Sequence, residues 1–332
     1  MLQSVKNLAK LPLETLAARF GQHRRAVSEP SLWIIMYHRV LPKTDPRHAL
    51  EEPGMIVEPE TLKLHLEVLR EFFTLLPLSE WVERRASGKP LPDRSCAITF
   101  DDGWRDNFEY AFPLLERAQV PATLFAVSDM IGGNEAFWPN RIQRLLQLPA
   151  EARSGIRWLQ ELLPQGHADA ELSAQAIYSL KRYSDPQLLE MIGEAEERLG
   201  LEPEGEASLM DQAQLRAISD NPLFEIGSHT RRHIRLREDL DRKVLADEVA
   251  LSKTRLEEML DKPVELFCYP NGDYCDAAVE TVSRHYKAAV TTRSGINRAS
   301  SADPFLLHRF GVHQDASRNR RKLLARVADW PG

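Results

Sequence analysis

The chain has 332 residues, of which 43% are hydrophobic and 28% are charged, values that are typical of a soluble globular protein. Its formal net charge of -6 gives no sign of the basic surface on which nucleic-acid binding depends. No apolar run reaches about 18 residues, so the sequence predicts no membrane-spanning helix. Three cysteines without a CxxC pair (Cys96, Cys268 and Cys275) favour free thiols in a reducing compartment. We therefore expect a cytoplasmic protein, or one at the inner membrane surface.

The first 30 residues predict an amphipathic helical segment and not a secretory signal, because they lack a continuous apolar run. Apolar residues recur there at roughly helical spacing with basic residues between them, and Pro12 interrupts the pattern. The apolar residues are Leu2, Val5, Leu8, Leu16 and Phe20. Two interpretations stay open: a helix packed on the main domain, or an interfacial helix in peripheral contact with an anionic membrane.

From residue 31 onward, short β-rich runs alternate with longer helical periods, which is the pattern of βα units. Strands are expected at Trp33–His38, Thr74–Leu76, Cys96–Phe100, Ala122–Val127, Phe224–Ser228, Glu265–Tyr269, Ala288–Thr292 and Leu306–Val312. Helices are expected at Glu60–Glu71, Trp104–Arg117, Arg242–Leu260 and Ala277–His285. The alternation predicts an α/β domain over residues 31–316.

One region interrupts this alternation. Residues from about 140 to 220 carry helical patterns, such as Ile156–Leu163 and Pro186–Leu199, and no strand pattern. They predict a helical insertion in the α/β domain. Residues 317–332 predict a basic C-terminal helix, centred on Arg318–Trp330, whose lysines and arginines either line a solvated face or contact lipid or phosphate.

The strongest local signal is the pair Asp101 and Asp102 in the segment TFDDG, directly after an expected strand. Two adjacent carboxylates repel each other unless a positive charge lies beside them, and a metal ion supplies that charge. Gly103 then permits a sharp turn. Adjacent acids also occur in ordinary surface loops, so this segment alone does not decide the function.

Two histidines form the second signal, in the segment HTRRH. His229 follows the expected strand Phe224–Ser228, and His233 lies four residues later, where both rings can reach one ion. Two unrelated surface histidines are the alternative. With one carboxylate from TFDDG, they would give three protein ligands and an open position for water, which is the arrangement of catalytic metal sites.

Two further segments end expected strands. In FCYPNG, Pro270 and Gly272 set a tight turn that can direct a backbone N–H into a cleft. In MYHRV, His38 closes the first strong strand. Strand C-termini share one face in parallel βα folds, and that face holds the site, so these segments should lie together.

Together these segments resemble the polysaccharide deacetylases, the NodB-homology enzymes of carbohydrate esterase family 4. TFDDG at 99–103, HTRRH at 229–233, FCYPNG at 267–272 and MYHRV at 36–40 carry the likeness, which runs from about Trp33 to Val312 apart from the insertion. The YPxG form of the third motif is associated with exopolysaccharide or surface-glycan synthesis. The resemblance implies a distorted (β/α) barrel with its site at the strand C-termini.

The resemblance also implies roles for the motif residues. Asp102, His229 and His233 would hold Zn²⁺ or another divalent ion such as Co²⁺ or Ni²⁺. Asp101 would be the general base, and the backbone N–H of Asn271 would stabilise the oxyanion together with the metal.

The chain departs from the family pattern at two positions. Many members carry an arginine where this chain has Cys268, and that arginine orients the base, so we expect Arg309 on the last strand to replace it. The family often places its acid histidine in an LxxH motif, which Leu306-Leu307-His308 fits poorly. We therefore favour His38 as the general acid, with His308 and His313 as alternatives.

Tyr269, Pro270 and Trp138 are predicted to contact the substrate. Trp138 precedes the insertion, where its ring would form a stacking platform for a sugar or serve as a core or hinge tryptophan. The predicted function is metal-dependent removal of N-acetyl groups from a carbohydrate, either a polysaccharide or a glycan precursor. The alternatives are a catalytically silent carbohydrate-binding module, and an amidohydrolase or deformylase that acts on a non-polymeric amide. The sequence does not predict an oligomeric state.

Overall fold

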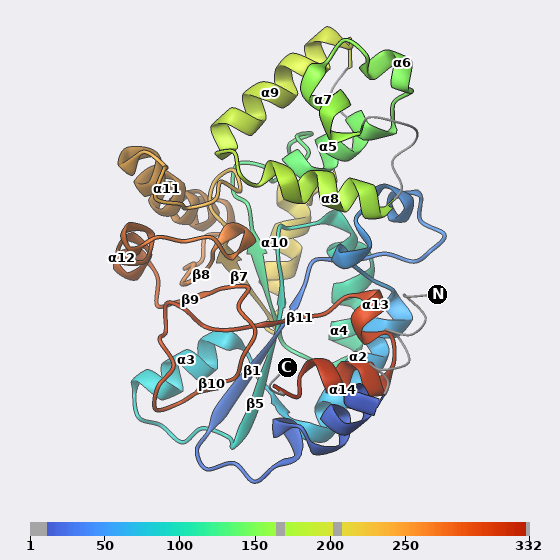
Figure 1. Cartoon of the computed structure of the whole chain (residues 1–332). Helices are drawn as coiled ribbons and strands as arrows, with labels where there is room; N and C mark the ends of the chain where they lie inside the picture. Colours follow the sequence, from blue (N-terminus) through green and yellow to red (C-terminus); the bar gives the residue numbers. More distant parts are fainter. Residues whose placement is uncertain (1–11, 164–169, 202–207, 330–332) are drawn as a thin grey trace.

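One curved sheet forms the centre of the computed structural model, which describes residues 12–163, 170–201 and 208–329 (Figure 1). Its strands are β1 (Ser31–Tyr37), β4 (Thr74–Leu75), β5 (Arg94–Phe100), β6 (Ala122–Ala126), β7 (Phe224–Ser228), β8 (Leu266–Cys268), β9 (Ala288–Val290), β10 (Asn297–Arg298) and β11 (Phe310–Gly311). Within the described residues, these nine strands run in the order β10-β1-β5-β6-β7-β8-β9, with β11 beside β1 and β4 beside β5. Except for β10 against β1, the pairs are parallel.

The two faces of the sheet bury different side chains, because successive residues of a strand point to opposite faces. Leu32 and Ile34 of β1 pack in one apolar cluster with Phe125, whereas Trp33 and Ile35 pack in another with the surrounding helices. The first cluster fills the interior of the curved sheet. Strands that are apolar on both faces are typical of parallel sheets covered by helices.

The segment after β10 brings the two ends of the sheet together. Leu307 bridges to Val290 of β9, and β11 then pairs with Ile35 and Met36 of β1. The expected strand Leu306–Val312 is thus divided between two neighbours, and only Phe310–Gly311 is regular strand. This arrangement is the predicted distorted (β/α) barrel.

Helices surround the sheet and link its strands. They are α2 (Pro59–Phe72), α3 (Leu78–Ala86), α4 (Phe112–Ala118), α5 (Trp138–Gln147), α6 (Ala150–Arg153), α7 (Arg157–Leu162), α8 (Ala170–Leu180), α9 (Asp185–Arg198), α10 (Gln212–Asp220), α11 (Arg242–Leu260), α12 (Asp276–His285), α13 (Gln314–Ser317) and α14 (Arg320–Arg326). A separate two-stranded pair joins β2 (Arg39–Val40) to β3 (Ile56–Val57). The helix expected at Trp104–Arg117 is interrupted near its start by a π-turn over Asn107–Ala111, which precedes α4. Pro113 explains this, since proline cannot donate the regular backbone hydrogen bond.

The helical region expected at about 140–220 consists of two parts. Helices α5 to α9 share an apolar core of their own, which includes Trp138, Leu159 and Ile177. In contrast, Leu215 and Ile218 of α10 pack in the main core. The structure therefore groups α10 with the barrel and α5 to α9 as the insertion, which Figure 1 shows gathered at one end of the barrel.

Both ends of the described chain are helical. Residues 12–20 form a helix that buries Ala17 and Ala18, while Leu13, Leu16 and Phe20 are 61%, 46% and 49% exposed. The other apolar residues of the expected N-terminal pattern lie outside the described residues. The basic helix expected at Arg318–Trp330 is shorter, as α14. None of the helices that the structure describes has the length and apolar character required to cross a membrane.

Candidate metal and catalytic site

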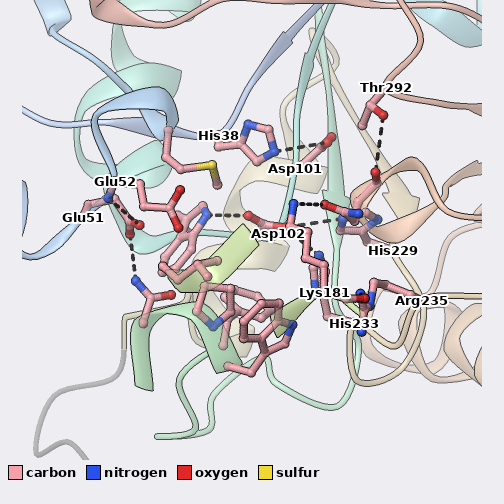
Figure 2. A pocket seen from close by; sticks show the side chains of 18 residues that line it. His38, Glu51, Glu52, Asp101, Asp102, Lys181, His229, His233, Arg235 and Thr292 are labelled. Atoms are coloured by element: carbon pink, nitrogen blue, oxygen red, sulfur yellow. Dashed lines mark hydrogen bonds and ion pairs between the residues drawn. The ribbon is translucent and has the colours of Figure 1, made fainter. Parts of the chain in front are cut away.

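Four of the parallel strands end at the same side of the barrel and carry the motif residues there. Asp101 and Asp102 follow β5, His229 follows β7, Asn271 lies in the turn after β8, and His38 follows β1. All five line one cavity of about 150 Å³ (Figure 2). The sequence motifs, which are far apart along the chain, therefore meet because the strands are parallel.

Two of these side chains, Asp102 and His229, converge on a single point with His233, which also lines the cavity. Oδ1 of Asp102 lies 3.4 Å from Nε2 of His229 and 3.4 Å from Nε2 of His233. Ligands held about 2.1 Å from a tetrahedral zinc ion lie about 3.4 Å apart, so this spacing fits such an ion. Burial lowers the pKa of His233 to about 3, which keeps the ring neutral and its lone pair available. The donor set thus suits a divalent metal.

Two further contacts orient these ligand groups. Nδ1 of His229 lies 2.8 Å from the carbonyl oxygen of Cys268 and donates its proton there, which leaves Nε2 directed at the site. The indole Nε1 of Trp104 donates to Oδ2 of Asp102 over 2.8 Å. Burial alone would raise the pKa of Asp102, but the hydrogen bond with His229 holds it well below its usual range. Asp102 is therefore ionised and fixed in orientation.

A second set of donor atoms, from Asp101, His229 and Cys268, is also close enough to surround an ion. Burial raises the pKa of the Cys268 thiol, which disfavours the thiolate that metals bind. Both oxygens of Asp101 already accept hydrogen bonds from Arg309. Of the two groups, Asp102, His229 and His233 are therefore the better candidates to hold a metal ion.

Arg309 holds Asp101 from inside the barrel. Its Nη1 and Nη2 donate to Oδ1 and Oδ2 of Asp101, each over 2.7 Å, and its Nε donates to the carbonyl oxygen of Thr291. Nη2 also lies 3.1 Å from Sγ of Cys268, the position where many family members carry the arginine. Although burial opposes ionisation, the Arg309 charge holds the pKa of Asp101 below its usual range. The structure thus places Arg309 where the sequence predicted an orienting group.

Among the three candidate acid histidines, His38 reaches the cavity. Its Nε2 lies 3.7 Å from Oδ2 of Asp101, and its side chain is 21% exposed. Neither His308 nor His313 is among the described residues that line the cavity. This placement favours His38 as the proton donor.

The turn after β8 presents Asn271 to the cavity. Asn271 adopts a left-handed conformation (φ 57°, ψ 4°), which asparagine tolerates better than most residues. Gly272 follows with φ 75°, where a Cβ would overlap Thr292. Within the described part of the chain, the N–H of Asn271 has no backbone acceptor, so it is available to an oxyanion.

The residues predicted to contact the substrate lie in different places. Tyr269 and Pro270 are buried and are absent from the described lining of the cavity. Since Cys268 points into the barrel, alternation directs Tyr269 to the opposite face, where it packs among the helices. Trp138 does line the cavity and also belongs to the core of the insertion. Of the three, Trp138 is therefore the one that the structure places at the cavity.

Comparison with known proteins places the chain in a family. Residues 88–289 match the family model described as polysaccharide deacetylase. The chain belongs to the polysaccharide deacetylase family. This confirms the resemblance that the four motifs carry.

Among curated polysaccharide deacetylases, the chain is 23% identical over 259 residues to the poly-beta-1,6-N-acetyl-D-glucosamine N-deacetylase of Escherichia coli strain K12. It is 24% identical over 190 residues to the protein of the same name from Staphylococcus epidermidis. These alignments cover 77% and 54% of this chain. They cover 34% of the first relative and 61% of the second, so the chain spans about a third of the Escherichia coli protein's length.

Solved structures of deacetylases share the fold. The Streptococcus pyogenes deacetylase PplD in complex with acetate has a TM-score of 0.60 at 19% identity, over 92% of this chain and 100% of that one. IcaB from Ammonifex degensii has a TM-score of 0.59 at 17% identity, over 90% and 97%. With the sheet topology, these similarities confirm the predicted barrel fold.

Several residues that line the cavity had no recognisable signal in the sequence. Glu51 and Glu52 come from the loop after β2, and Lys181 comes from the end of α8. Arg235 follows the HTRRH segment by two residues, and Thr292 follows β9.

Backbone conformation also marks the site. Of the seven non-glycine residues with positive φ in the described chain, four lie in the site's motifs: Asp102, Thr230, His233 and Asn271. Such strained backbone tends to gather at functional sites.

Proposed function

We propose that this protein is a metal-dependent carbohydrate deacetylase that hydrolyses the C–N bond of an N-acetyl group. The observation that carries the proposal is the placement of Asp102, His229 and His233 beside Asp101, whose carboxylate Arg309 holds from the opposite side. The named activities of the Escherichia coli and Staphylococcus epidermidis relatives support an N-acetylglucosamine chain as substrate. A role in exopolysaccharide or glycan-precursor synthesis follows from that substrate.

Asp102, His229 and His233 would hold the metal, and their nitrogen and oxygen donors suit Zn²⁺, with Co²⁺ or Ni²⁺ as alternatives. When bound, such an ion supplies Lewis acidity, which polarises the amide carbonyl and makes water more acidic. Asp101 accepts the proton of the attacking water. Because Arg309 occupies both of its oxygens from one side, Asp101 is ionised and held in one orientation.

The remaining groups act on the substrate as the C–N bond breaks. The N–H of Asn271 donates to the oxygen of the former carbonyl, on which negative charge develops. His38 donates a proton to the departing amine, and its partial exposure allows it to regain that proton from solvent. The products are acetate and a free amino sugar.

A catalytically silent binding module would not require the buried pair of Arg309 and Asp101, because burying an ion pair costs desolvation energy. An amidohydrolase acting on another amide would use the same side chains, so substrate trials separate it from the proposed enzyme.

The test measures acetate released from a short β-1,6-linked N-acetylglucosamine oligomer by the full chain, after chelation and after zinc is restored. We expect activity to disappear and to return. Asp101→Asn should bind metal yet turn over about 10²- to 10⁴-fold more slowly, the usual contribution of a general base. Asp220→Asn, at an exposed carboxylate outside the cavity, serves as the matched control. Acetate release that is indifferent to chelation, or unchanged in Asp101→Asn, would overturn the proposal.

A further inference from the structure

The cavity is bounded by two parts of the chain. The barrel supplies the metal ligands and the base, and the insertion supplies the side that faces them, with Trp138, Ile177 and Lys181 among its contributions. Figure 2 shows Lys181 and Arg235 near His233, on the other side of the acidic pair from Glu51 and Glu52. At about 150 Å³ the cavity is smaller than the roughly 300 to 1,000 Å³ of common ligand pockets.

Lys181 closes this cavity on one side. It directly follows α8, and its Nζ donates to Oδ1 of Asn271 over 2.8 Å, which joins the insertion to the turn after β8. The two residues are 90 positions apart in sequence. One hydrogen bond therefore ties the insertion to the turn that presents the oxyanion donor.

The main chain at Lys181 is itself fixed. Its carbonyl oxygen accepts hydrogen bonds from Nη1 of Arg235, over 2.8 Å, and from Nη1 of Arg237, over 3.0 Å. Arg235 is buried and also pairs with Asp185 at the start of α9, over 2.9 Å. Charge-assisted hydrogen bonds of this kind are stronger than neutral ones, so these partly buried contacts anchor the Lys181 main chain to the segment after β7.

A second hollow lies directly beyond this contact. It has a volume of about 580 Å³ and is lined by Arg237, Asp273 and Tyr274, among others. Lys181, Arg235 and Asn271 line both hollows. These three residues are therefore a partition between the reaction cavity and the neighbouring hollow.

We propose that this partition restricts deacetylation to a sugar at the end of its chain. Resting on the proposed function, the inference concerns which sugar of a substrate the same site accepts. A sugar held at the metal ligands has the partition on one side, so its chain can continue only on the other. The Lys181 side chain is then a specificity-determining group. Without it, the two hollows join, and an internal sugar can reach the metal site.

The experiment determines which sugars of an oligomer lose their acetyl groups. Oligomers of β-1,6-linked N-acetylglucosamine with a labelled reducing end are treated with the zinc-loaded full chain, and the deacetylated positions are read by tandem mass spectrometry. We expect the wild type to favour one terminal sugar over internal sugars by at least about tenfold, because an internal sugar would have to displace the Lys181 contact. Lys181→Ala should bring internal positions to within about threefold of the terminal one.

Arg182→Ala is the matched control, since Arg182 is the exposed neighbour of Lys181 and is not among the described residues that line either hollow. It should keep the terminal pattern. Internal deacetylation by the wild type at a rate similar to that of the terminal sugar, or an unchanged pattern in Lys181→Ala, would overturn the inference while leaving the proposed function intact. An absence of acetate from every oligomer would instead show that the proposed function fails.

Discussion

Removing the guanidinium of Arg309 tests how Asp101 is made a base. Arg309 is fully buried and donates two hydrogen bonds of 2.7 Å to the carboxylate of Asp101, which is 2% exposed. An arginine in such contact lowers a carboxyl pKa by about 1 to 3, equivalent to roughly 1.4 to 4 kcal/mol. That range overlaps the approximately 3 to 5 kcal/mol lost when one partner of a buried ion pair is removed. In Arg309→Ala, burial acts without the opposing charge, so the pKa of Asp101 rises.

A general base works only when it is deprotonated. A higher pKa for Asp101 therefore moves the acid limb of the rate profile to higher pH, by about 1 to 3 pH units. We also expect the rate above that limb to fall by about 10- to 100-fold, because Asp101 loses its fixed orientation. The assay is acetate release from an N-acetylglucosamine oligomer across pH, with bound metal measured in the same samples.

Two further variants separate the possible causes of a shifted acid limb and a lower rate in Arg309→Ala. Arg309→Lys keeps a positive charge but not the paired donors. The pKa of Asp101 should therefore stay closer to its wild-type value than the rate of acetate release does. Arg153→Met removes another buried arginine, from the insertion, and should leave both the limb and the rate unchanged. A folded Arg309→Ala protein with normal turnover and an unmoved acid limb would refute the role given to Arg309.

Three other variants test separate parts of the structure. Trp104→Phe removes the indole donor to the carboxylate of Asp102, so metal affinity measured by competition with a chelator should fall about 10- to 100-fold. Trp81→Phe should not change it, because the buried Nε1 of Trp81 has no hydrogen-bond partner in the described chain. His38→Gln should retain metal and lower turnover by about 10²- to 10⁴-fold, and a near-normal rate would assign the acid elsewhere. Gly227→Ala forces a Cβ against a buried phenylalanine ring, so urea unfolding should show a loss of about 1 to 3 kcal/mol. Gly193→Ala, which has open space around it, should be neutral or stabilising, and equal losses in both would contradict the packing explanation.

Local sequence signals predicted much of the arrangement. Parallel strands with short apolar runs place their C-termini on one face, so the residues after β1, β5, β7 and β8 had to meet once those strands were recognised. Arg309 was expected for a different reason, because Cys268 stands where many family members carry the orienting arginine and Arg309 lies on the last expected strand. The structure brings Arg309 to Asp101 as expected, within hydrogen-bond distance.

Other features depend on contacts that no local pattern encodes. Tyr269 was predicted to contact the substrate, but strand alternation turns it outward, since its neighbour Cys268 faces the barrel. Lys181 reaches the site only because the insertion folds back over it, through contacts with residues 54 to 90 positions away. The π-turn before α4 was visible only as Pro113 within a helical pattern. Pairings over such sequence distances follow from the packing of whole elements, not from local preference.

The measurement that tests the central claim most directly is metal content per chain by elemental analysis, for wild type, His229→Ala and His285→Ala purified identically. His285 is an exposed histidine at the end of α12 and controls for the loss of a histidine as such. The structure predicts about one divalent ion per chain in the wild type and in His285→Ala, and little in His229→Ala, because three protein ligands hold a catalytic ion and one would be lost. Equal metal in all three proteins, or none in the wild type after zinc is supplied, would contradict the assigned site.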